Sequence, residues 1–138
     1  MKTLLAAVLL VTLAPGMIAA DAPRELSPEE VELLARTAAE ATGVAKLKGF
    51  SLARAQMYQF PHFYFFDALV SEPEAQGFSG HYAVNKITAE VWDPYGCSRL
   101  SHPSLSELQQ KLRTEIGVSA KKYRQFSKED PCLAGVRH

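Results

Sequence analysis

The stretch HFYFFDALV, residues 62–70, decides the fold that the sequence predicts. Aromatic and apolar residues occupy both of its alternating sets of positions, so both faces of an extended strand would be apolar. The two sets are Phe63, Phe65 and Leu69 on one face, and Tyr64, Phe66 and Ala68 on the other. We therefore expect a central strand with one face against a helix, while the other face needs a second cover or a partner.

The residues around this stretch favour further strands. From Phe50 to Asp93, aromatic and β-branched residues dominate, and prolines and glycines punctuate them as turns would. This pattern predicts an antiparallel meander, with a tight hairpin around Ile87-Thr88 between its last two strands. The predicted strands are Leu52–Gln59, His62–Val70, Gly80–Lys86 and Ala89–Asp93.

An amphipathic helix is expected before the strands, over residues 28–42. Ser27 and Glu30 have the spacing of a capping box, and Pro28 suits the first helical position. Apolar residues then recur on one helical face until Gly43 offers a C-terminal stop.

A second amphipathic helix is expected after the strands. Ser104 and Glu107 have capping-box spacing, apolar residues repeat at helical intervals as far as Ile116, and Gly117 ends the element. A short basic turn of helix over Val118–Phe126 follows. The order of elements predicts an α+β domain, in which an N-terminal and a C-terminal helix pack on an antiparallel meander of about four strands.

The N-terminus has the three parts of a secretory signal peptide. Lys2 is basic, an apolar run extends to Leu13, and small residues precede a cleavage point after Ala20. A proline and a glycine end the apolar run below the roughly 20 residues that a membrane-spanning helix needs. We expect a cleaved signal peptide at 1–20 and a single periplasmic or secreted α+β domain at 21–138, with no stable membrane insertion. An uncleaved anchor is the alternative.

Cys97 and Cys132 are the two cysteines of the chain. In an exported protein such a pair is expected to form a disulfide, which would also fix the C-terminal segment. An intermolecular bond or a reactive thiol is the alternative, although neither cysteine has the CxxC spacing of a redox centre.

Charge is balanced over the whole chain but not along it. The 15 basic and 15 acidic residues do not fit a nucleic-acid-binding protein. Residues 21–45 are mainly acidic, whereas residues 111–128 contain basic groups against Glu115 alone. The two regions are either solvated helix faces or a dipole that steers a charged partner.

No segment carries a complete catalytic, metal-binding or phosphate-binding motif. His62 and His81 could lie on neighbouring strands, but two imidazoles without a third ligand make a weak zinc site. Asp67 lies within an apolar strand and needs a partner, for which Arg54 on the neighbouring strand is the candidate. A small hydrolase built around Asp67, His62 and His81 is a third possible class. We expect a protein that is not an enzyme and holds no metal or cofactor.

Aromatic residues and an acidic loop are the candidate contact surfaces for a protein partner. Most of the aromatic residues should form the core, but exposed Tyr and Trp residues are common anchors at interfaces. The loop Ser71–Ser79 is acidic and lies between strands, as an inhibitory loop could, or it is an ordinary solvated loop. The candidate binding residues are Tyr58, Glu72, Glu74, Trp92 and Tyr95.

The segment HYAVNKITAEVWD, residues 81–93, resembles a hairpin of small bacterial periplasmic proteins, YAVN-x-x-T-x-E-VW. Such hairpins occur in PepSY-like and cystatin-like domains and in proteins that neutralise exported toxins or lysozymes. These relatives usually carry Gly where this chain has Ala89. The resemblance implies a protein that binds another protein outside the cytoplasm.

Together these features predict a non-enzymatic periplasmic binding protein, of the immunity or inhibitor type, that occludes an exported enzyme acting on the cell envelope. The alternative is a PepSY-like accessory or regulatory domain of the envelope. The sequence leaves the identity of the partner and the oligomeric state open.

Overall fold

The computed structural model describes residues 23–71 and 77–133 of the chain. The expected signal peptide at residues 1–20 lies outside these ranges, as do Glu72 and Glu74. Within the described ranges, no helix is both long and apolar enough to cross a membrane.

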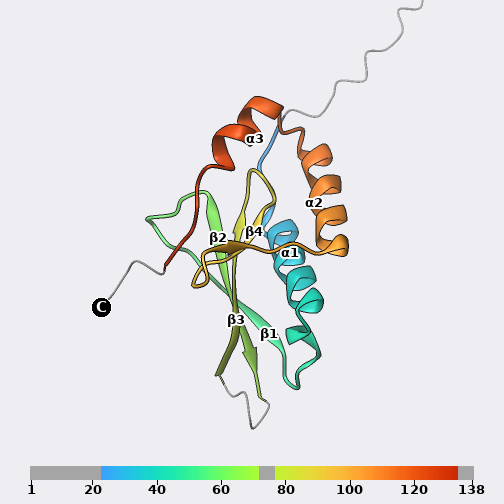
Figure 1. Cartoon of the computed structure of the whole chain (residues 1–138), viewed down its shortest axis with the longest axis vertical. Helices are drawn as coiled ribbons and strands as arrows, with labels where there is room; N and C mark the ends of the chain where they lie inside the picture. Colours follow the sequence, from blue (N-terminus) through green and yellow to red (C-terminus); the bar gives the residue numbers. More distant parts are fainter. Residues whose placement is uncertain (1–22, 72–76, 134–138) are drawn as a thin grey trace, which may run out of the picture.

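Five antiparallel strands and the helices around them make up the described fold (Figure 1). The strands form one sheet in the order β1-β2-β3-β4-β5. The predicted α+β class is confirmed, with five strands in place of about four and with the basic turn forming a third α-helix. The elements are α1 (Pro28–Ala41), η1 (Val44–Lys46), β1 (Ser51–Ala55), β2 (Phe63–Val70), β3 (Gly77–Asn85), β4 (Val91–Asp93), β5 (Ser98–Arg99), α2 (Pro103–Ile116) and α3 (Ala120–Phe126).

The start of α1 follows the predicted capping box. Glu30 N–H donates to the Ser27 hydroxyl at 3.2 Å, and Ser27 N–H donates to the Glu30 carboxylate at 2.8 Å. The guanidinium of Arg24 hydrogen-bonds the same carboxylate at 2.7 and 2.8 Å and lowers the pKa of Glu30 from its ordinary 4.5 to about 2. The first turn of α1 is therefore held by charge as well as by hydrogen bonds.

The start of α2 differs from the prediction. The N-cap is His102, whose ring nitrogen accepts the Ser104 N–H at 3.3 Å, and Pro103 occupies the first helical position. Ser104 is thus inside the helix, and the predicted capping box with Glu107 is wrong. His102 and Pro103 already supply a cap and a pre-set φ, so the helix begins two residues earlier than the predicted cap at Ser104 implies.

One face of the sheet is covered by α1 and α2, which lie on the same side of it in Figure 1. This face contains the main apolar core, in which Phe66 of β2 is 1% exposed. Alanines on α1 let the helix lie close to the strands. The core residues include Val31, Leu34, Ala35, Ala38, Phe66, Ala68, Tyr82, Val84, Val91, Leu105, Leu112 and Ile116.

The other face of the sheet carries a smaller cluster of buried residues. These are Phe63, Phe65, Ala83 and Trp92, against which Met57, Phe60, Cys132 and Leu133 pack. The prediction that β2 is central is confirmed, because β1 and β3 pair with it on either side. The second cover that its apolar face requires comes from the C-terminal segment together with the β1–β2 connection.

The hairpin between β3 and β4 is wider than the tight turn predicted at Ile87-Thr88. The Asn85 side-chain carbonyl accepts the N–H groups of Ile87 and Thr88, at 2.9 and 3.2 Å. Ala89 takes a left-handed conformation with φ of 62°, and β4 begins at Val91. The methyl group of Ala89 is fully buried, although this backbone conformation usually favours glycine.

Candidate protein-binding surface

Helix α3 crosses one end of the second sheet face. Its N-cap Ser119 accepts the Lys122 N–H at 3.1 Å, which starts the helix directly after α2. At the other end, the Phe126 ring meets the His62 ring edge-on at 4.8 Å, and the Phe126 carbonyl accepts from the Asn85 amide at 3.3 Å. Contacts at both ends therefore fix this short helix.

A buried carboxylate joins α3 to the β3–β4 hairpin. Glu90 is 6% exposed, and its two oxygens accept from the hydroxyls of Tyr123 at 3.1 Å and Thr88 at 3.2 Å. The Arg99 guanidinium lies 3.5 Å from it. Burial, followed by the negative charge of Glu90, raises the pKa of Tyr123, so its hydroxyl stays protonated as a donor. The charge of Glu90 is thus compensated within the network.

Two arginines from different elements pack against the ends of this network. Arg99 of β5 stacks over Trp92 at 4.9 Å from the ring centroid and donates to the Ser127 carbonyl at 2.5 Å. Arg113 of α2 lies 5.3 Å from the centroid of the Tyr123 ring. These contacts hold α3 to the sheet and to α2.

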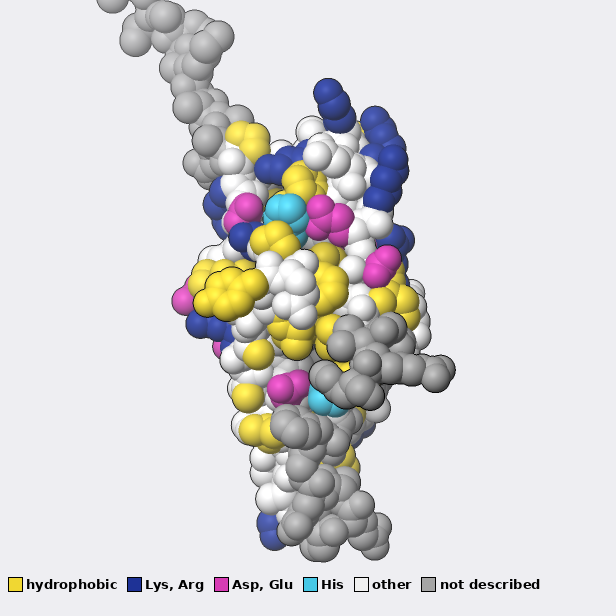
Figure 2. All heavy atoms as spheres, turned by 90° about the vertical axis from the view of Figure 1, so that its left-hand side faces the viewer, with side chains coloured by type: hydrophobic (Ala, Val, Ile, Leu, Met, Phe, Trp, Pro, Cys, Tyr) yellow, Lys and Arg dark blue, Asp and Glu magenta, His cyan; other side chains and the backbone are white. Residues whose placement is uncertain are grey.

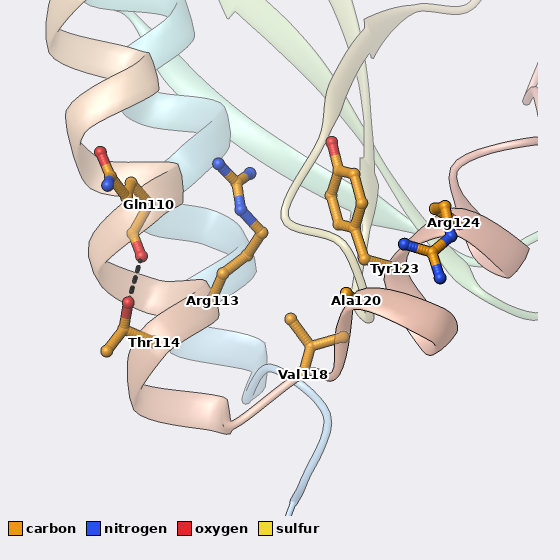
Figure 3. A pocket seen from close by; sticks show the side chains of 7 residues that line it. All are labelled: Gln110, Arg113, Thr114, Val118, Ala120, Tyr123 and Arg124. Carbon is orange, nitrogen blue, oxygen red and sulfur yellow. Dashed lines mark hydrogen bonds between the residues drawn. The ribbon is translucent and has the colours of Figure 1, made fainter.

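Two hollows flank α3, and Arg124 belongs to the lining of both. The inner groove, of about 490 Å³, lies between α2 and α3, and Figure 3 shows Arg113 and Tyr123 side by side within it. The outer groove, of about 830 Å³, lies on the Trp92 side of α3. The inner groove is lined by Gln110, Arg113, Thr114, Val118, Ala120, Tyr123 and Arg124, and the outer groove by Trp92, Arg99, Lys121, Arg124, Gln125, Ser127, Lys128 and Asp130.

The outer groove is cationic, and Arg99 is the member of its lining that forms an ion pair. Lys121, Arg124 and Lys128 make no ion pair and no side-chain hydrogen bond with the described residues. Figure 2, which looks onto the second sheet face, shows Lys and Arg gathered at the end where α3 lies, above a belt of hydrophobic side chains. The sole carboxylate in the lining is Asp130, which accepts the Cys132 N–H at 3.3 Å.

Asp67 and His81 form a separate polar pair farther along the second sheet face. Asp67 lies opposite His81 in the β2–β3 register, and the carboxylate and ring nitrogen are 2.7 Å apart. The Tyr95 ring centroid lies 4.5 Å from that of His81. The predicted partner of Asp67 was Arg54, and this is wrong, because Arg54 is one position out of phase on β1 and lies over the Tyr64 ring instead.

The two histidines do not form a shared metal site. His62 pairs with Glu129 at 2.8 Å, while His81 pairs with Asp67. In the described part of the chain, the one group of three possible ligands is Cys97, Asp130 and Cys132, and there the two cysteines are bonded to each other.

The predicted binding residues lie in different places. Tyr58 is fully exposed in the β1–β2 connection, and Tyr95 is 55% exposed. Trp92 was expected to be exposed, but it is 8% exposed, because Arg99 and the C-terminal segment cover it. The structure brings Trp92 and Cys132 together in one cluster, against which Met57, the neighbour of Tyr58 in sequence, also packs.

The cysteines are joined as the sequence predicted. Cys97 and Cys132 form a disulfide with Cα atoms 5.0 Å apart. The Leu133 N–H donates to the Pro94 carbonyl at 2.8 Å, so the bond and this hydrogen bond together hold the C-terminal segment on the second sheet face. Such a bond is compatible with an oxidising compartment outside the cytoplasm.

Sequence reasoning missed the outer groove as a site. The signal was present as the excess of basic residues between positions 111 and 128. A sequence pattern alone does not show that Arg99, from a different element, joins them.

The fold is similar to that of a chain in the structure of a type VI secretion system effector–immunity complex from Pseudomonas protegens. The two chains are 20% identical, with a TM-score of 0.61, and the similarity covers 78% of this chain and 90% of that chain. At this identity the similarity concerns the fold alone. No protein-family model and no curated protein matches the chain, and the expected PepSY-like or cystatin-like relationship is not confirmed.

Proposed function

We propose that this chain is a non-enzymatic binding protein of the immunity type, which occludes an exported effector enzyme that acts on the cell envelope. The observation that carries the proposal is the shared fold with a chain of an effector–immunity complex, which extends over 90% of that chain. The disulfide and the expected signal peptide support action outside the cytoplasm.

The α3 surface supports inhibition by a preformed binding site. The Glu90 network and the disulfide hold α3 and the C-terminal segment in place before any partner arrives. Little conformational entropy is then lost when the partner binds, and more of the contact energy contributes to affinity. Side chains that protrude from an effector would enter the grooves beside α3, and the bound domain would exclude substrate from the active site.

Protection from a toxin tests this proposal. The exported product of the adjacent open reading frame is produced in the periplasm of a host, with and without this chain. We expect growth to stop without the chain and to recover with it, and the two proteins to copurify. Absence of both protection and a complex, with both proteins correctly exported, would contradict the proposal. Growth arrest relieved without a complex would favour the PepSY-like accessory role instead.

A hydrolase is the second candidate function, because Asp67 and His81 form a close pair on an open sheet face. Under this alternative, the carboxylate would orient the imidazole as a general base. Asp67→Asn should then abolish a measured hydrolytic activity, whereas under the immunity proposal the same variant keeps its protective effect.

A further inference from the structure

The outer groove offers cationic donors that the rest of the chain leaves unmatched. Lys121, Arg124 and Lys128 are without ion pairs among the described residues, although carboxylates elsewhere pair with Arg24, Arg36, Lys86 and Lys111. All three are exposed and line one groove, whose sole carboxylate is that of Asp130. An incoming anion would therefore meet several positive charges that no described carboxylate pairs with.

The same lining contains a buried tryptophan whose donor the described residues leave unsatisfied. The indole N–H of Trp92 has no hydrogen-bond acceptor in the described part of the structure, although the side chain is only 8% exposed. Trp92 lines the outer groove beneath Arg99. Buried donors are rarely left unsatisfied in folded proteins, so an acceptor from outside the described residues is expected here.

We infer that the outer groove binds carboxylate groups on an acidic surface of a protein partner. This inference rests on the proposed function, because it assigns the groove as the part of the domain that meets the effector. Lys121, Arg124 and Lys128 pair with the partner's carboxylates, and the planar guanidinium of Arg124 can bind one of them through two hydrogen bonds. Arg99 stays on Glu90 and keeps Trp92 in place.

The charge distribution favours a protein surface over an extended polyanion. The cations lie around one groove at one end of the domain, and the chain as a whole has 15 basic and 15 acidic residues. Nucleic acids and phosphate polymers are bound by longer basic surfaces on proteins with a net positive charge. A patch of limited extent suits a small cluster of carboxylates.

Titration of the mature domain with short poly-L-glutamate tests the inference. The chain has a single tryptophan, so Trp92 fluorescence reports directly on the outer groove. We expect a saturable change in emission whose affinity falls as salt is added. The variant Arg124→Glu with Lys128→Glu should bind about tenfold more weakly or worse. Polyphosphate and poly-L-lysine are titrated in parallel.

The matched control makes the same change in net charge at two lysines outside the outer groove. Lys46→Glu with Lys111→Glu alters two exposed lysines outside the groove and should leave the titration unchanged within about twofold. The inference is overturned by equal losses in both double variants, by tighter binding of polyphosphate than of polyglutamate, or by no response of Trp92. If any of these occurs while the chain still protects against the toxin, the inference fails and the proposed function stands.

Discussion

The two faces of the sheet are covered in different ways. On one face, α1 and α2 bury an apolar core in which the sheet contributes Phe66 and its neighbours. On the other, the β1–β2 connection and the disulfide-bonded C-terminal segment cover a smaller cluster, and a polar network joins the buried Glu90 to α3. The comparison indicates that the first face supplies most of the stability, and under our proposal the second face presents the binding groups.

Removing a large side chain from the first face should have the largest effect on stability. Phe66→Ala leaves a cavity between the sheet and the helices and should lower the free energy of unfolding by about 4 kcal/mol. Urea denaturation of the mature domain measures this loss. Leu33→Ala, on the exposed side of α1, is the control and should change stability by less than about 1 kcal/mol. Equal losses in the two variants would contradict the assignment of the core.

Removing the disulfide should cause the second-largest loss of stability. The bond closes a loop with a sequence separation of 35, so replacing Cys97 and Cys132 by Ser should cost about 3 kcal/mol. Amide hydrogen exchange should then be faster in the C-terminal segment and α3, while α1 keeps its protection relative to global unfolding. Loss of protection that begins in α1 would show that the two faces do not differ as described.

The polar network around Glu90 should contribute less to the free energy of unfolding than the core or the disulfide does. Tyr123→Phe removes the hydroxyl that donates to Glu90 and leaves a buried carboxylate with one donor fewer, at a cost of about 1–2 kcal/mol. Because the ring stays in place, the loss measures the hydrogen bond rather than packing. Thr114→Val, which removes an exposed hydroxyl from α2, is the comparison, and an equal cost there would argue against the network.

The smallest expected effect is the pH dependence at the start of α1. The pKa of Glu30 is lowered from 4.5 to about 2 in the folded protein, so its contribution is fully present above about pH 5 and is lost as pH falls toward 2. The pair with Arg24 is partly exposed to solvent, which limits the contribution to about 1 kcal/mol or less. In the variant Arg24→Gln, the free energy of unfolding should depend less on pH between about 5 and 2. An unchanged pH dependence in this range would contradict the pairing of Arg24 with Glu30.

Local patterns in the sequence predicted much of the fold. Ser27, Pro28 and Glu30 mark the start of α1 through contacts within one turn, and the apolar positions of β2 identify it as central. The pairing of Cys97 with Cys132 was also predictable, because the chain has no other cysteine. Each of these features depends on residues that are close in sequence or unique in type.

The features that sequence reasoning missed depend on register and tertiary packing. Asp67 pairs with His81 and not with Arg54, because strand alternation places Arg54 on the opposite face of the sheet. Trp92 is buried because Arg99 and residues near the C-terminus cover it. The outer groove likewise depends on where α3 packs, which the excess of basic residues alone could not determine.

Amide hydrogen exchange of the mature domain, alone and bound to the effector that we propose it neutralises, tests the central claim most directly. The claim is that α3 and the outer groove form the binding surface. We predict that binding slows exchange in Ala120–Phe126 and in the residues around Lys128, while α1 is unchanged. Slower exchange confined to α1 or to the β1 edge, with α3 unaffected, would contradict the claim.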